Sequence, residues 1–193
     1  MSYAALGKLT KKIKINHDLA IGLWATGVHD ARVLSLMVAD PARGDKTLMN
    51  AWVAALGNYV ITDSFSTYAS KTPMALERAV VWIGDSGEWV SSAGWNVLGQ
   101  LASNDPSVDD LIFERQIVTI EREIFGAKNR TRHAMNAALI AIGARSPELR
   151  DAAEASARRI GKVVVDHGDT NCATPDAIAH IKKILDHRAK RLT

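Results

Sequence analysis

Every proline in this chain follows a serine, a threonine or an aspartate, and none of them interrupts a helical pattern of apolar residues. The five pairs are Asp40-Pro41, Thr72-Pro73, Asp105-Pro106, Ser146-Pro147 and Thr174-Pro175. A residue before proline avoids the α region and suits a helix N-cap, and proline itself fits the first helical turn. We therefore expect most of these pairs to mark the starts of helices.

The apolar residues between the prolines recur with helical spacing. One segment with the pattern i, i+3, i+4, i+7 ends close to Gly57 and consists of Met49, Trp52, Val53 and Leu56. A second segment with the same pattern ends close to Gly143 and consists of Met135, Ala138, Leu139 and Ile142. Asn16 is a candidate N-cap for a helix that stops near Gly27, and Ile178, Ile181 and Leu185 mark a last helix. The run 163–165, three valines, is the only strand-like stretch and is too short to found a sheet.

This pattern predicts an all-α fold of about ten helices joined by short connections. Segments 31–57, 73–103 and 107–145 have the length and pattern of successive helical hairpins. We interpret the chain as one domain, 1–193, in which antiparallel helix pairs stack into a superhelical HEAT-like or ARM-like solenoid with a concave face. No exact repeat is visible, so the solenoid is an inference from the hairpins.

Composition is that of a globular protein. The chain has 193 residues, of which 47% are hydrophobic and 23% charged, and a formal net charge of +3. The single cysteine, Cys172, excludes an intramolecular disulfide and fits a reducing compartment. The first residues lack the long apolar core of a signal peptide or an anchor, so we expect a cytoplasmic protein.

Basic residues gather in three places, and most common catalytic signatures are missing. The clusters are Lys8 to Lys14, Lys128 to Arg132, and Lys182 to Arg191. They are either solvated helix faces or a surface that follows phosphates. The sequence has no P-loop, GxGxxG, HExxH, CxxC or GxSxG pattern. The run 166–172, DHGDTNC, fits no zinc spacing and is interpreted as a loop, so no metal or cofactor is predicted.

One carboxylate stands apart from other charges. Asp63 lies in GNYVITDSFSTYASKTP, where the next charged residue is Lys71, and Tyr59 precedes it by four residues. If this run is helical, the ring and the carboxylate share a face and could hold a developing positive charge. The alternative is structural, because Asp63 in TDSFS could be the N-cap of a helix.

The segment Leu23 to Pro41, LWATGVHDARVLSLMVADP, resembles the LW-x-TG-[IV]-H-[ED]-AR signature of the DNA alkylation repair glycosylases with HEAT-like repeats (AlkD-like). The resemblance continues over nearly the whole chain, through YVITD, SKTPMALERAVVW, EWVSSAGWNVLGQLA, RHAMNAALIAIGARSPEL and GKVVVDHGDTNCATPDA. It implies a stack of helical pairs that holds double-stranded DNA, in some cases alkylated, on a basic concave face.

The activity implied by the resemblance is hydrolysis of the N-glycosidic bond of N3- or N7-alkylated purines. Alkylation makes the base cationic, so the base leaves as a neutral molecule and what needs stabilising is the oxocarbenium-like sugar. By resemblance, Asp63 is the catalytic aspartate and Tyr59 stands where the best-known members have a tryptophan. Ser92 stands where many members have an arginine that contacts the DNA backbone, and Ala137 where active members have a second tryptophan.

These departures leave three hypotheses open. The first is a DNA glycosylase, weak or altered in activity, with Asp63 and Tyr59 at its catalytic site. The second is a non-catalytic protein that binds DNA structures, and the third is a helical scaffold for a protein partner. The predicted DNA contacts are His29, Arg32, Lys71, Trp89, Ser92, Trp95, Lys128, Arg130, Arg132 and Arg145. The enzyme requires Asp63 to be exposed in a basic groove beside Tyr59 or Trp89, whereas the scaffold requires an apolar concave face.

Overall fold

Helices account for almost all regular structure in the chain. The computed structural model describes residues 2–191, apart from the side chain of Tyr3, and within this part no strand occurs. The described helices are α1 (Tyr3–Ile13), α2 (His17–Ala25), α3 (His29–Val38), the 3₁₀ helix η1 (Pro41–Arg43), α4 (Lys46–Ala54), α5 (Tyr59–Ala69), α6 (Ala75–Ile83), α7 (Glu88–Asn104), α8 (Asp110–Glu123), α9 (Asn129–Gly143), α10 (Pro147–Ile160) and α11 (Ala177–Ala189). The all-α prediction is confirmed.

Helix starts are fixed by polar caps, and proline takes a smaller part than predicted. Asn16 accepts from the amide of Leu19 at 3.1 Å and so caps α2 as expected. Pro41 and Pro147 are first residues of their helices. The other three prolines lie in the turns before α6, α8 and α11, whose N-cap positions belong to Met74, Asp109 and Asp176. For these pairs the predicted starts are two to four residues early.

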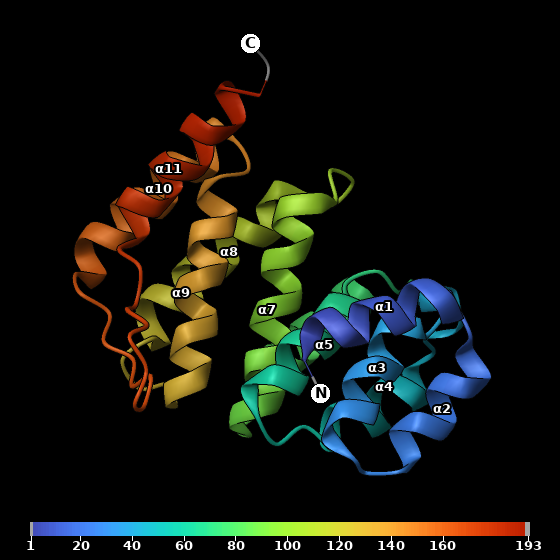
Figure 1. The fold of residues 1–193 in the computed structure, drawn as a ribbon. Coiled ribbons are helices and arrows are strands. Elements are labelled where there is room, and N and C mark those ends of the chain that lie inside the picture. Colours follow the sequence, from blue (N-terminus) through green and yellow to red (C-terminus); the bar gives the residue numbers. More distant parts are fainter. Residues whose placement is uncertain (1, 192–193) are drawn as a thin grey trace.

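The helices form two layers (Figure 1). Each odd-numbered helix packs against the next odd-numbered one, from α1 through to α11. The even-numbered helices cover one side of this row, so that α2 packs on α3, α6 on α7 and α8 on α9. The predicted hairpins 73–103 and 107–145 are therefore confirmed. The predicted hairpin 31–57 is wrong, because η1 redirects the chain and α3 packs on α2 and α5 instead of α4.

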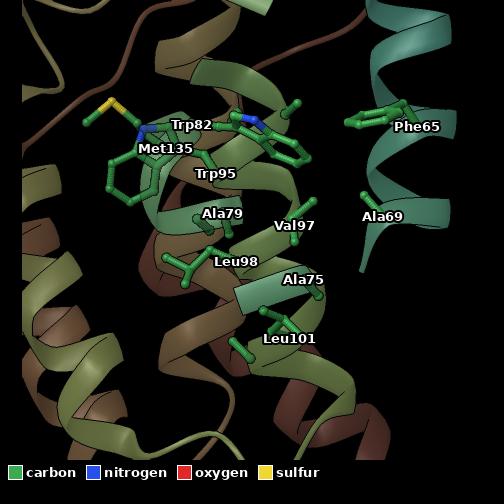
Figure 2. Close-up of a cluster of buried hydrophobic side chains, with 14 of the residues drawn as sticks. Phe65, Ala69, Ala75, Ala79, Trp82, Trp95, Val97, Leu98, Leu101 and Met135 are labelled. Atoms are coloured by element: carbon green, nitrogen blue, oxygen red, sulfur yellow. The ribbon is translucent and has the colours of Figure 1, made fainter. Parts of the chain in front are cut away.

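The backbones of α6 and α7 approach each other closely within the core (Figure 2). A Cβ at Gly94 would lie 2.6 Å from the backbone nitrogen of Ile83 and 2.9 Å from the carbonyl carbon of Trp82, so only glycine admits this approach. The rings of Trp82 and Phe65, from α6 and α5, lie 5.4 Å apart beside the buried Trp95. This contact ties α6 to α5, while α7 packs on both of these helices.

Residues 161–176 form an irregular connection between α10 and α11. Gly161 ends α10 with a φ of 71°, a conformation that favours glycine. The side chain of Asn129, at the start of α9, both donates to the carbonyl of Asp166 and accepts from its amide, each at 2.8 Å. The connection is thereby tied to α9. Among the described residues, no helix has the length and apolar character required to span a membrane.

Candidate nucleic-acid interface

A groove opens on the layer of odd-numbered helices, between α5, α7 and α9. Its volume is about 370 Å³. We call it the Asp63 groove, and its walls come from three helices: Asp63, Ser66 and Thr67 on α5; Trp95, Asn96, Gly99, Gln100 and Ser103 on α7; and His133, Ala137, Ala138 and Ala141 on α9. The structure thus brings together side chains that are up to 78 positions apart, from Asp63 to Ala141. Among the described residues, no lysine or arginine lines these walls, so the expected basic groove is wrong for the groove itself.

Asp63 lies within α5 and caps no helix. The N-cap of α5 is Asn58, whose side-chain oxygen accepts from the amide of Ile61 at 3.0 Å, so the cap interpretation of Asp63 is wrong. Asp63 is exposed, as is Tyr59 one turn before it. Both side chains therefore lie on the outward face of α5, as the four-residue spacing predicted.

The Asp63 carboxylate has one side-chain hydrogen bond and no ion pair among residues 2–191. Asn96 donates from Nδ2 to Oδ1 of Asp63 at 3.0 Å, across the floor of the groove. Although the side chain contacts solvent, the surrounding groove walls remove part of its hydration. This burial raises the pKa of Asp63, while the charge of Arg130 and the bond from Asn96 lower it by smaller amounts.

The guanidinium group of Arg130 lies over the aromatic ring of Tyr59. The Arg130 guanidinium carbon lies 5.0 Å from the ring centroid, a cation–π distance. Arg130 is in the first turn of α9, and its amide donates to Oε1 of Glu88 at 2.7 Å. The hydroxyl of Thr131 donates to the Glu88 carbonyl at 3.1 Å. Glu88 therefore attaches the start of α9 to the start of α7 and places Arg130 over α5.

His133 adds a neutral imidazole to the same groove. Burial, together with the charges of Arg130 and His167, lowers the pKa of His133 to about 4, so the ring is uncharged at neutral pH. Its Nδ1 is buried and has no hydrogen-bond partner in the described structure. The ring meets His167 edge-on, with centroids 5.6 Å apart.

Sequence reasoning missed Asn96 and His133. A signal for His133 was present, since Arg130, His133, Ala137 and Ala141 recur at helical spacing and so share one face of α9. Ala137, predicted to stand at the position of a tryptophan, does lie exposed in the groove. Asn96 had no comparable signal, because its pairing with Asp63 depends on how α7 crosses α5.

Three of the predicted DNA contacts hold helix ends within the fold. Arg145 donates to the carbonyls of Ala102, Asp105 and Val108 and pairs with Asp110 at 2.7 Å. Arg132 donates to carbonyls at and after the end of α8, among them Ile124 and Ala127. Arg32 reaches the carbonyls of Trp24 and Ala55. These guanidinium groups satisfy orphan carbonyls, and DNA contact by them stays a prediction.

The remaining predicted contacts divide between the interior and the surface. Ser92 and Trp95 are buried, and the Ser92 hydroxyl donates to the Glu88 carbonyl at 2.6 Å. Trp89 is half-buried in the first turn of α7. Three are exposed: His29 at the start of α3, Lys71 after the end of α5 and Lys128 at the start of α9. Of the ten residues predicted to contact DNA, Arg130 is the one that lies beside both Tyr59 and Asp63.

Comparison with known proteins agrees with the fold. An uncharacterized protein of Listeria innocua is 32% identical over 178 residues, which cover 91% of this chain and 75% of the relative. An uncharacterized protein of Listeria monocytogenes matches with the same identity and coverage. A solved structure superimposes with a TM-score of 0.88 at 27% identity, over 97% of this chain and 81% of that one. It represents a family of proteins related to the HEAT-like repeat DNA glycosylases, with affinity for branched DNA structures.

The predicted HEAT-like stack is confirmed by this superposition, and the resemblance found in the sequence is confirmed as well. The sequence model of one family, DNA alkylation repair enzyme, matches residues 2–181. With nearly all of its length matched, the chain belongs to the DNA alkylation repair enzyme family.

Proposed function

We propose that this chain is a DNA glycosylase that hydrolyses the N-glycosidic bond of N3- or N7-alkylated purines, and that it works as one HEAT-like domain over residues 1–193. The observation that carries the proposal is Asp63, an exposed carboxylate without an ion pair in the described structure, in a groove that adjoins Tyr59. The cytoplasmic location stays a prediction.

The chemistry asks little of the protein beyond a fixed negative charge. The cationic alkylpurine leaves as a neutral base when the bond to C1′ breaks and both bonding electrons stay with the base nitrogen. The Asp63 carboxylate stabilises the positive charge that develops on the sugar. A water then adds to C1′, and Asp63, whose pKa is raised by burial, orients this water and takes up its proton.

Asn96 keeps the carboxylate in place during these steps. Its amide holds Oδ1 of Asp63 at 3.0 Å and leaves Oδ2 for the sugar or the water. Because the amide carries no net charge, it orients the carboxylate without cancelling the negative charge that the sugar requires. The groove, about 370 Å³ in volume, is large enough for a deoxyribose edge.

The test is release of 7-methylguanine from alkylated duplex DNA. We expect release by the wild type and a roughly 100-fold or larger loss of rate in Asp63→Asn, the size seen when one electrostatic stabiliser is removed. Asp151→Asn is the matched control, since Asp151 is an exposed aspartate on α10, outside the groove. Release that survives Asp63→Asn would remove Asp63 as the catalytic carboxylate.

A second candidate is a protein that binds DNA structures without catalysis. Two observations favour it: Ala137 leaves the groove wall without an exposed tryptophan, since the lining Trp95 is buried, and the similar solved structure belongs to a family with affinity for branched DNA. It predicts no release of 7-methylguanine but binding to a three-way junction that weakens steeply with salt. The third hypothesis, a protein scaffold, is less well supported because Asp63, Asn96 and His133 make the groove polar.

A further inference from the structure

The aromatic face beside Asp63 is already covered by a cation of the chain itself. The guanidinium of Arg130 lies 5.0 Å from the centre of the Tyr59 ring. A cationic base that approached this face would have to displace Arg130 and would meet its charge. Tyr59 is therefore poorly suited to receive an alkylated base, and its ring must serve another purpose.

The charge on Arg130 has no carboxylate partner in the described part of the chain. Most other arginines near carboxylates form ion pairs, as Arg150 does with Asp151 at 3.1 Å and Arg159 with Glu121 at 2.6 Å. Glu88, whose carboxylate contacts the start of α9, instead accepts from the backbone amide of Arg130. The guanidinium thus keeps its donors for an outside anion, and it stands at the start of α9, where the helix dipole also favours one.

The position of Arg130 is held from two sides. Glu88 fixes its backbone through a 2.7 Å hydrogen bond, and the Tyr59 ring supports its side chain. A guanidinium that is already oriented loses less conformational entropy when it binds a planar pair of oxygen atoms. This arrangement is typical of a phosphate-binding arginine.

We propose that Arg130 binds the DNA phosphate that flanks the deoxyribose facing Asp63, with Tyr59 as the residue that positions it. The proposal rests on the proposed binding of DNA in the Asp63 groove. The two groups then fix the direction of the strand, because the anionic phosphate lies over α9 and the sugar over α5. Tyr59 thus contacts Arg130 and not the alkylated base. Cationic bases are selected because they leave easily as neutral molecules.

The same arrangement links DNA binding to the strength of the carboxylate. In the free protein, the charge of Arg130 lowers the pKa of Asp63 and partly offsets its negative potential. A phosphate on Arg130 neutralises that charge. The negative electrostatic potential of the Asp63 carboxylate then acts undiminished on the sugar, and only when the DNA backbone is bound to Arg130.

The experiment measures how salt affects binding to a fluorescein-labelled duplex with a central tetrahydrofuran abasic analogue. Anisotropy titrations between about 50 and 200 mM salt give the slope of log Kd against log salt, and one lost phosphate contact lowers this slope by about one. We expect this loss, with roughly tenfold weaker binding, in Arg130→Gln. Arg150→Gln, at a half-exposed arginine on α10 that lies outside the groove, is the matched control and should bind as the wild type does.

Two further variants separate charge from position. Tyr59→Leu keeps the charge of Arg130 but removes its support, so binding should weaken while the salt slope is retained. Tyr59→Phe keeps the aromatic face and should restore wild-type binding. Thermal melts check that each variant is folded. We expect melting temperatures close to that of the wild type, because Arg130 contacts Glu88 through its backbone amide and the Tyr59 side chain is exposed.

A neutral phosphate analogue identifies the contact itself. Methylphosphonates are placed one at a time at the phosphates flanking the tetrahydrofuran. At one position the wild type should lose about as much affinity as Arg130→Gln does with natural DNA, and Arg130→Gln should be insensitive there. Equal sensitivity of both proteins at every position, or an unchanged salt slope in Arg130→Gln, overturns the assignment while the glycosylase proposal stands. A wild type that binds no DNA overturns both.

Discussion

The contact between α6 and α7 determines whether Asn96 reaches Asp63, and Gly94→Ala tests it. The Cβ of an alanine would lie 2.6 Å from the nitrogen of Ile83, 2.9 Å from the carbonyl carbon of Trp82 and 3.0 Å from the carbonyl oxygen of Ala79. All three atoms are backbone, so no side chain can rotate away and the two helices must separate. Overpacking of this kind costs about 3 kcal/mol, at the upper end of its usual range.

A gain partly offsets this cost. Alanine in a helix interior is about 1 kcal/mol more favourable than glycine, which leaves a net loss of about 2 kcal/mol in the free energy of unfolding. Gly99→Ala is the matched control in the same helix, since its nearest neighbours lie at 3.4 to 3.9 Å and cause no clash. It should gain up to about 1 kcal/mol from helix propensity alone.

Urea unfolding followed by circular dichroism measures both variants against the wild type. We expect the midpoint of Gly94→Ala to fall and that of Gly99→Ala to stay or rise. If Gly94→Ala proves as stable as Gly99→Ala, α6 and α7 do not approach as closely as described. The same displacement would loosen the bond from Asn96 to Asp63, so Gly94→Ala should also raise the pKa of Asp63, as followed by the carboxyl carbon shift in NMR spectra.

Three further substitutions address the site. Because burial raises the pKa of Asp63, its ionised form costs folding free energy above that pKa. Asp63→Asn should therefore be more stable than the wild type in urea at neutral pH, and the difference should vanish in acid, where Asp63 is protonated; a less stable Asp63→Asn would contradict the raised pKa. Ser92→Arg should lose about 3 kcal/mol in the same assay because Ser92 is buried, so an arginine cannot be accommodated there, and a stable variant would refute this. Ala137→Trp adds an aromatic to an exposed groove position and should tighten binding to a tetrahydrofuran duplex roughly tenfold, as base stacking does; unchanged or weaker binding would count against DNA in the groove.

Local sequence patterns were sufficient for the helices but not for their pairing. Caps such as Asn16 act within one turn, so the residues that form them are neighbours in the sequence. The partner of α3 depends on the turn at Pro41–Arg43, where three residues of 3₁₀ helix redirect the chain. Nothing in the apolar spacing of residues 31–57 distinguishes a hairpin from two helices that diverge, which explains the failed pairing.

The candidate site shows the same division. The four-residue spacing of Tyr59 and Asp63 placed both on one face of α5 because that relation is local. The cap interpretation failed because Asn58, five residues earlier, was the better cap and moved the start of α5 upstream. Asn96 was unpredictable, since its hydrogen bond depends on a crossing set by Gly94 and α6.

Charge runs were the weakest guide to DNA contacts, and the reason is physical. An arginine in the first turn of a helix, or just after its end, lies close to the carbonyls that end the neighbouring helix. Arg132 and Arg145 donate to such carbonyls, so most of their hydrogen-bond donors are occupied within the fold. Arg130, two residues from Arg132, points to the opposite side of α9, finds an aromatic ring in place of carbonyls and keeps its donors. In a stack of short helices, the helical face of an arginine is therefore more informative than the density of charge around it. A basic run becomes evidence for phosphate binding only at residues whose donors are not occupied by carbonyls or carboxylates of the fold.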